Sequence, residues 1–284
     1  MDSPERKYFE FSNGNIVLDL SRPAVMAILN TTPDSFSDGG LFVSKNAALD
    51  RIGLMVDEGA AIIDVGGEST RPGSDPVSVE VELERISPVL EEAVGNYQET
   101  LFSIDTTKYE VAKRALELGV HFVNDVSGLR KEPRLAELCA ANNAGYILMH
   151  SQGDPKTMQK KPQYTDVIRD IDIFFSEKLE QLEKWGVNKV ILDPGIGFGK
   201  TLEHNLNIIR KLDTFTRHGT PLLVGASRKS MIGQILDNRD VSGRLAGTIA
   251  VHYHCLLNGA GILRVHDVKE AVDSIQIFQA IHDG

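Results

Sequence analysis

Two chemical kinds of side chain recur along this sequence, each near the end of a short apolar run or within a few residues after it. One kind is acidic or amide in character and comprises Asp105, Asn124 and Asp193. Such groups suit a ligand with an array of N–H donors, because a carboxylate accepts hydrogen bonds and an amide both donates and accepts them. The other kind is cationic and comprises Arg71, Lys229, Arg264 and His266. These side chains suit a phosphate, so the two sets together predict a site for a ligand with both features.

The apolar runs before these side chains have the composition of strands buried on both faces of a parallel sheet. They occupy residues 24–30, 61–67, 101–106, 121–126, 146–150, 189–194, 222–226 and 261–267. Side chains alternate in direction along a strand, so Arg264 and His266 in the last run point the same way. This spacing favours a shared anion site over two unrelated surface cations.

Stretches with helical spacing lie between the apolar runs. Residues 49–56 place apolar side chains on one face, and residues 167–182 carry a longer stripe of the same kind. A helix over 79–94 is expected to kink or restart at Pro88. Alternating strands and helices without a linker predict an α/β fold, a closed (β/α)8 TIM barrel, with an open sheet of eight parallel strands as the alternative.

The first residues of the chain stand outside this alternation. Residues 8–20 form two alternating segments around Asn13 and Gly14, a pattern that is typical of a β-hairpin. We therefore expect an N-terminal hairpin extension over 1–22 and a single barrel domain over 23–284.

In a barrel of this type the C-terminal ends of the strands and the loops after them build the active site. Every predicted strand end here is polar. The residues at these ends are Asn30, Asp64, Glu68, Thr70, Arg71, Asp105, Asn124, Asp125, His150, Asp193, Lys200, Arg228, Lys229, Arg264 and His266.

Composition excludes several classes of partner. The 284 residues include 40 acidic and 30 basic side chains, a net charge of −10, which argues against nucleic acid or an anionic membrane as the main partner. The sequence lacks an uncharged apolar run of about 18 residues, so no membrane span is expected. Two cysteines, Cys139 and Cys255, exclude a disulfide framework and favour a reducing cytoplasm.

Seven motifs, in this order, resemble those of the dihydropteroate synthases. They are MAILNTTPDSFSDGG at 26–40, GGESTRPG at 66–73, SIDT at 103–106, NDVSG at 124–128, DPGIGFGK at 193–200, GASRKS at 225–230 and RVHD at 264–267. The resemblance implies a TIM-barrel transferase of folate biosynthesis that joins (7,8-dihydropterin-6-yl)methyl diphosphate to 4-aminobenzoate and releases 7,8-dihydropteroate and pyrophosphate. It also implies a target of sulfonamides, which imitate 4-aminobenzoate.

The resemblance assigns roles to residues at the matching positions. The pterin diphosphate would be bound by Thr70, Asp105, Asn124, Asp193, Lys229, Arg264 and His266. The catalytic residues among them would be Asp105, Lys229, Arg264 and His266. This assignment is chemically reasonable, because the pterin edge resembles a guanidinium and a buried carboxylate can accept two parallel hydrogen bonds from it.

The remaining implied contacts concern the metal and the second substrate. Asn30 would supply an oxygen ligand to Mg²⁺, which keeps mostly water and phosphate oxygens. The 4-aminobenzoate pocket would be lined by Phe36, Arg71, Phe198 and Ser230. The loops at 31–40 and 68–75 resemble two mobile loops of the family. Family habit implies a homodimer, and the helices expected over 245–257 and 268–281 are apolar enough to form its interface.

Two alternatives share the pterin contacts. One is a barrel that transfers a methyl group from a folate to a corrinoid, which would not need the SRKS segment, the Arg71 loop or the RVH strand. The other is a catalytically silent pterin-binding barrel, which predicts loss of Asn30, Lys229, Arg264 or His266. The sequence contains all of these features, so the synthase is the preferred hypothesis.

Overall fold

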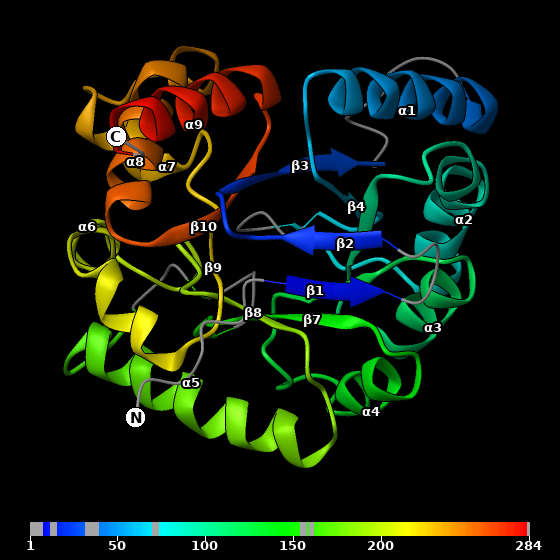
Figure 1. The fold of residues 1–284 in the computed structure, drawn as a ribbon, viewed down its shortest axis with the longest axis horizontal. Helices are drawn as coiled ribbons and strands as arrows, with labels where there is room; N and C mark the ends of the chain where they lie inside the picture. Colours follow the sequence, from blue (N-terminus) through cyan, green and yellow to red (C-terminus); the bar gives the residue numbers. More distant parts are fainter. Residues whose placement is uncertain are drawn as a thin grey trace.

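The computed structural model describes residues 8–11, 16–31, 40–69, 74–153, 158 and 162–282, without the side chains of 40–44. Within this part of the chain, eight parallel strands close into a barrel with the order β10-β3-β4-β5-β6-β7-β8-β9 (Figure 1). The strands are β3 (Ala24–Asn30), β4 (Ile62–Gly66), β5 (Leu101–Asp105), β6 (Phe122–Asp125), β7 (Gly145–Met149), β8 (Val190–Asp193), β9 (Leu222–Val224) and β10 (Ala260–Val265). Each predicted run forms one strand, so the closed barrel is confirmed and the open sheet is wrong.

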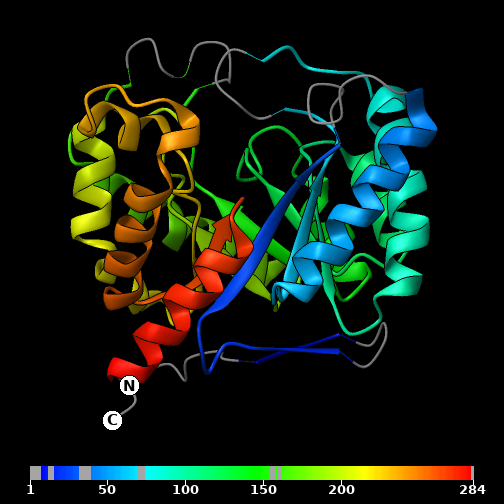
Figure 2. The same cartoon turned by 90° about the horizontal axis from the view of Figure 1, so that it is seen from above.

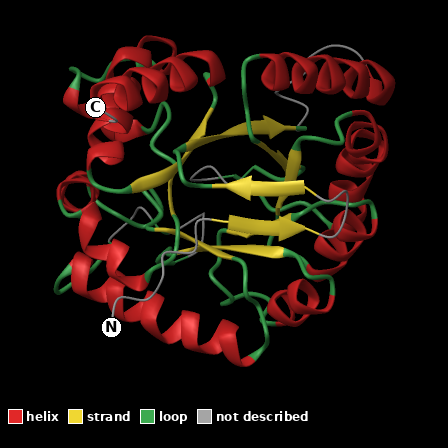
Figure 3. Ribbon diagram, in the orientation of Figure 1, coloured by secondary structure: helices red, strands yellow, loops and turns green. Residues whose placement is uncertain are grey.

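Helices surround the barrel on its outside (Figure 3). They are α1 (Gly40–Asp57), α2 (Val79–Asn96), α3 (Tyr109–Glu117), α4 (Arg134–Ala141), α5 (Val167–Lys184), α6 (Leu202–Arg210), α7 (Ser230–Ile235), α8 (Leu245–Leu257) and α9 (Val268–His282). Short 3₁₀ segments at Leu212–His218 and Val241–Gly243 join some of them. Among the described residues, no helix is both long and apolar enough to cross a membrane.

The helix α2 differs from the sequence prediction. Pro88 lies inside it, yet the helix continues from Val79 to Asn96 without a restart. Ile86 and Leu90, on either side of the proline, are buried against the barrel. Tertiary packing of this apolar face therefore outweighs the hydrogen bond that proline removes.

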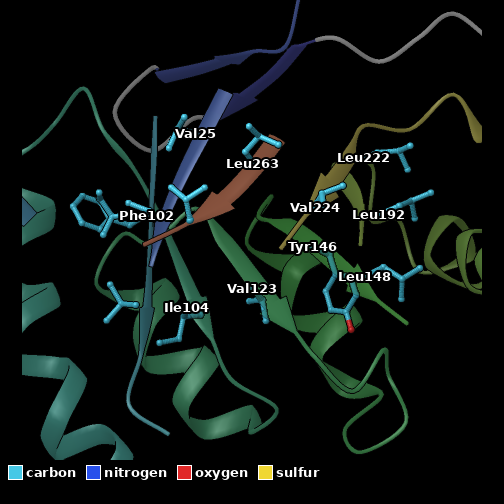
Figure 4. Packing of buried hydrophobic residues seen from close by; sticks show 14 of the residues in the cluster. Val25, Phe102, Ile104, Val123, Tyr146, Leu148, Leu192, Leu222, Val224 and Leu263 are labelled. Carbon is cyan, nitrogen blue, oxygen red and sulfur yellow. The ribbon is translucent and has the colours of Figure 1, made fainter. Parts of the chain in front are cut away.

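The main core lies between the barrel and the helices. Outward-facing strand residues such as Val25, Phe102, Val123 and Leu148 belong to this buried cluster (Figure 4). The outward face of the strands is thus committed to packing, and it leaves the inward face to build the site.

A second core fills one end of the barrel interior. It takes one residue from each barrel strand, namely Met26, Ile62, Leu101, Phe122, Ile147, Ile191, Leu223 and Ile262. The hairpin of β1 (Tyr8–Phe11) and β2 (Ile16–Asp19) closes this end, where Phe9, Phe11 and Leu18 join the same cluster. The hairpin lies across the bottom of the barrel in Figure 2, at the end where the strands begin.

Candidate active site

The polar site begins two residues along each strand from the apolar core layer, on the face that points into the barrel. A step of two residues along a strand keeps a side chain on the same face. Two residues after the core layer, the strands carry Asp64, Ser103, Asn124, Asp193 and Arg264 on β4, β5, β6, β8 and β10. One more step on β5 gives Asp105, which lies beside Asn124 in the register. The barrel therefore brings the acidic set and Arg264 together, as the sequence predicts.

Arg264 lies between two buried carboxylates. Its Nε donates to Oδ2 of Asp64 at 2.7 Å, and its Nη2 lies 2.6 Å from the same oxygen and 2.8 Å from Oδ2 of Asp105. Burial lowers the pKa of Arg264, but the neighbouring charges of Asp64 and Asp105 outweigh it and raise the pKa overall. The guanidinium is therefore charged and held in place before any ligand binds.

Asp105 is a buried carboxyl with a strongly raised pKa. Burial raises its pKa to about 7, although the Arg264 charge opposes the rise and Asp64 and Glu82 add to it. Its Oδ1 has no hydrogen-bond partner among the described residues. A buried, unpartnered carboxylate oxygen at a barrel mouth is an acceptor available to a ligand N–H.

Asn124 and Asp193 present further hydrogen-bonding groups on the inner wall. Asn124 is buried, and its Nδ2 donates to Oδ2 of Asp64 at 3.0 Å. Asp193 is also buried, and its Oδ1 accepts from the backbone N–H of Gly195 at 2.7 Å. Burial raises the pKa of Asp193, against the opposing effects of this hydrogen bond and of Lys229 and Arg264.

Two inward-facing glycines leave room above these polar side chains. A Cβ on Gly66 would come within 3.6 Å of Oδ1 of Asn30 and Cβ of Asp105. A Cβ on Gly225 would lie 4.0 Å from Oδ2 of Asp193. Because hydrogen replaces a side chain at both positions, a flat ring can approach the carboxylates closely.

The comparisons with known proteins agree with this geometry. Residues 26–266 match the family model described as pterin binding enzyme. The dihydropteroate synthase of Escherichia coli (strain K12) is 48% identical over 265 residues, which cover 93% of each chain. The chain belongs to the dihydropteroate synthases. These enzymes are transferases of folate synthesis, so the transferase prediction is confirmed.

Solved structures of dihydropteroate synthases share the fold. The Yersinia pestis dihydropteroate synthase, in a sulfonamide drug complex, is 44% identical with a TM-score of 0.88, covering 94% of this chain and 97% of that one. The Thermus thermophilus dihydropteroate synthase, in complex with 4-aminobenzoate, is 39% identical with a TM-score of 0.86, covering 97% and 100%. The TIM barrel that the resemblance implies is thus confirmed.

The loop after β8 places Phe198 in contact with Lys229. The Lys229 Nζ lies 4.1 Å from the centroid of the Phe198 ring, a cation–π contact. Lys229 directly precedes α7, whose first residue is Ser230. The structure thus brings together Phe198 and Lys229 from different loops, with Ser230 next to Lys229 in the chain.

A buried lysine fastens this loop to the end of β7. Lys200 is only 2% exposed, and its Nζ lies 3.0–3.1 Å from the backbone oxygens of Gly195, Phe198 and His150 and 3.1 Å from Nδ1 of His150. Burial lowers the pKa of Lys200 to about 7, while Asp193 opposes this fall. Burial, with the charge of Lys200, lowers the pKa of His150 to about 2, so the imidazole is a neutral acceptor.

The last strand ends in a second supported group. His266 follows β10, and its Nδ1 lies 3.0 Å from Oγ of Ser227, which also accepts from the His266 backbone N–H at 3.2 Å. Arg228 turns away from this pair and forms an ion pair with Asp267, through Nε at 2.9 Å and a second contact from Nη2. Ser227 thus holds both the ring and the backbone N–H of His266, whereas Arg228 holds the neighbouring Asp267.

Sequence reasoning missed some supporting groups and named others that lie outside the described residues. Thr70, Arg71 and Phe36 are among the latter. Missed were Ser227 and the buried Glu82, which pairs with Lys108; the Lys108 Nζ also donates to Oε2 of Glu68 at 2.6 Å. Asp64 stands at a predicted strand end, but its central position could not be read from the sequence. A buried acidic residue on α2 has no sequence signal of its own.

Proposed function

We propose that this synthase joins (7,8-dihydropterin-6-yl)methyl diphosphate to 4-aminobenzoate through the barrel-mouth cluster described above. The observation that carries the proposal is the position of Arg264, a charged guanidinium fixed between buried carboxylates. The cluster therefore offers acceptors for a ring rich in N–H groups and, next to them, a cation for a diphosphate. Solved dihydropteroate synthases have been described in the presence of pteroic acid, for the enzyme of Clostridium difficile, and in complex with 4-aminobenzoate, for that of Thermus thermophilus.

The pterin is proposed to lie over Gly66 and Gly225, where its edge meets Asp105, Asn124 and Asp193. Oδ1 of Asp105 is buried and unpartnered among the described residues. Oδ2 of Asp193 is the oxygen nearest the space over Gly225. Both carboxylates can accept N–H groups of the ring, and Lys229 can donate to a ring carbonyl or nitrogen.

The diphosphate is proposed to lie against Arg264 and His266, with a hydroxyl contact from Thr70. Arg264 lies near the end of β10, and His266 is the first residue after that strand. Arg264 is held by Asp64, and His266 is held by Ser227. Charge-assisted hydrogen bonds from these groups would stabilise pyrophosphate as it leaves.

Mg²⁺ is proposed as the cofactor, with Asn30 as its protein ligand. An amide oxygen at the end of β3, close to Gly66, fits a hard cation that takes most of its ligands from water and diphosphate. When bound there, Mg²⁺ would neutralise part of the charge of the leaving group.

For 4-aminobenzoate we propose a pocket lined by Phe36, Arg71, Phe198 and Ser230. Phe198 is supported in this role by the Lys200 contacts that fix its loop and by its contact with Lys229. Sulfonamides are proposed to compete for the same pocket.

In the reaction, the bond from the pterin methylene carbon to the diphosphate oxygen breaks first, and pyrophosphate takes the electron pair. The cation left at the methylene is stabilised by the carboxylates of Asp105 and Asp193. The arylamine nitrogen then forms the new bond to that carbon and loses one proton to water. An arylamine is already a nucleophile, so the site needs electrostatics and positioning more than a strong base.

The test is pyrophosphate release from the pterin diphosphate, with and without 4-aminobenzoate and with Mg²⁺ supplied or chelated. We expect dihydropteroate only when all components are present, and loss of most activity in Arg264→Ala. Arg210→Ala is the matched control, because Arg210 pairs with Glu203 on the surface of α6. Pterin binding without pyrophosphate release under any condition would contradict the proposal.

We also propose a cytoplasmic homodimer. Both cysteines are free and buried, which suits a reducing compartment. Leu257, Ile277 and Ile281 are 52–60% exposed near the ends of α8 and α9, and these helices pack on each other. An Ile281→Asp variant should sediment as a monomer, while Ile173→Asp on α5 should leave the mass unchanged; a monomeric native protein would contradict the dimer.

A further inference from the structure

Asp64 lies where the two chemical sets of the site meet. It is 1% exposed, and its Oδ2 accepts from Nε of Arg264 at 2.7 Å and from Nδ2 of Asn124 at 3.0 Å. The same oxygen lies 2.6 Å from Nη2 of Arg264 in the ion pair. Asp64, Asn124 and Arg264 come from β4, β6 and β10. One carboxylate oxygen therefore connects three strands inside the barrel.

The contact with Asn124 decides which way the amide faces. The Nδ2 of Asn124 donates to Asp64, since a carboxylate cannot donate to the amide oxygen. The Oδ1 of Asn124 must then point away from Asp64. An oxygen in that position accepts an N–H from a ring, whereas the flipped amide would offer a second donor and reject it.

The contact with Arg264 decides which edge of the guanidinium is used. Nε and Nη2 are occupied by Asp64 and Asp105. Among the described residues, none hydrogen-bonds to Nη1 of Arg264, so this nitrogen is available to an anion. Without Asp64 the guanidinium would be free to rotate toward Asp105 alone.

We propose that Asp64 is a positioning residue that fixes the pterin-reading amide of Asn124 and the diphosphate-binding guanidinium of Arg264 at one oxygen. This rests on the proposed roles of Asn124 and Arg264. By orienting both residues, Asp64 fixes the position of the pterin site relative to the diphosphate site. Asp64 itself acts through them.

The experiment measures binding of the two halves separately, by calorimetry with 6-hydroxymethylpterin and with pyrophosphate plus Mg²⁺. In Asp64→Asn we expect both affinities to fall about tenfold, because a neutral amide replaces the charged acceptor and can face Arg264 and Asn124 with its own NH2 group. Asn124→Ala should weaken only the pterin alcohol, and Arg264→Lys only pyrophosphate. The matched control is Asp172→Asn, because Asp172 is a buried acidic residue on α5 that pairs with Arg217 and His218.

The outcomes separate the inference from the proposed function. If Asp64→Asn binds both fragments as the native protein does and only its unfolding midpoint falls, Asp64 is merely structural and the inference is overturned. Weakening of one fragment alone also overturns it. If the Asn variant does not fold, Asp64→Ser gives the same readout with a smaller neutral side chain. Native protein that binds both fragments but forms no dihydropteroate contradicts the proposed reaction while leaving this inference standing.

Discussion

A buried arginine needs partners of opposite charge within the protein, because an isolated buried charge is very unfavourable. Arg264 has these partners in Asp64 and Asp105. The arrangement has a consequence for Asp105. Three charges share a small volume, so the protonation of this carboxyl is sensitive to pH and to the ligand bound beside it.

The raised pKa of Asp105 predicts a pH dependence of substrate capture. Below about pH 7 the carboxyl is protonated and accepts ring N–H groups poorly. We therefore expect kcat/KM for the pterin diphosphate to fall as the pH is lowered through about 7. Asp105→Asn should lower kcat/KM and remove its fall at low pH. If the same fall persists in Asp105→Asn, it belongs to the substrate or to another group, and the assignment to Asp105 is contradicted.

The same pKa sets a stability trend. The folded carboxyl holds its proton up to about pH 7, whereas the ordinary value is 3.8. Between these values the folded state binds more protons than the unfolded state, so this group makes stability fall as the pH rises from about 4 to about 7. Urea unfolding of the native protein and of Asp105→Asn over this range should show the slope only in the native protein.

Among the elements, the loop after β8 depends on Lys200. A Cβ on Gly195 would lie 2.0 Å from the backbone oxygen of His150, so this loop packs directly on the end of β7. The Lys200 ammonium joins the two segments through their carbonyl oxygens. Phe198 is fixed as a result, although it lies two residues away from the lysine.

We predict that Lys200→Met raises the KM for 4-aminobenzoate about tenfold, because several buried acceptors lose their donor and Phe198 moves. The KM for the pterin diphosphate should change much less. Steady-state kinetics with each substrate varied in turn measures this difference. Lys211→Met, on the exposed surface after α6, is the control. Equal changes in both KM values would show a general loss of structure.

The loop after β4 has a comparable anchor in Lys108, which pairs with Glu68 and with the fully buried Glu82. Lys108→Met leaves Glu82 uncompensated and should destabilise the protein by about 3 kcal/mol. The variant also releases Glu68, which accepts from the backbone N–H of Val77 at 3.0 Å. Glu68 lies in the same loop as Arg71, which we propose lines the 4-aminobenzoate pocket, so the KM for 4-aminobenzoate should rise.

Adding Glu82→Leu to Lys108→Met separates the two effects, because it removes the uncompensated charge. In the double variant the free energy of unfolding, measured with denaturant, should return toward the native value, while the KM for 4-aminobenzoate stays high. Lys113→Met, on the exposed face of α3, is the control for Lys108→Met. Recovery of both quantities together would show that Lys108 has only a structural role.

The sequence predicted the elements well, because strands buried on both faces must be apolar throughout. It also predicted that polar side chains lie at the ends of these strands. It could not predict that Arg264 pairs with Asp64, which lies 200 residues away in the chain. That contact depends on how β10 and β4 flank β3 in the closed barrel. Nor could it predict the burial of Lys200, since a lysine in a polar loop is usually exposed.

At the scale of the whole molecule, the barrel has an apolar end and a polar end. The hairpin covers the apolar end, where the Phe11 ring lies 4.9 Å from the ring of Phe122, centroid to centroid. The carboxylates and cations lie farther along the strands, one inward step or more beyond that layer. The apolar layer that stabilises the fold and the polar cluster that we propose binds the substrates therefore lie toward opposite ends of one interior.

This division predicts that Phe11→Ala destabilises the protein by about 3–5 kcal/mol, the usual effect of removing a buried phenylalanine. The KM values of both substrates should stay within about twofold of native at temperatures where the variant is folded. Urea unfolding and steady-state kinetics on the same preparation measure the two quantities, and Tyr8→Ala, at a 60% exposed position of the same strand, is the control. A large rise in either KM would mean that the inner layers shift together, so that the hairpin supports the geometry of the site as well as closing the barrel.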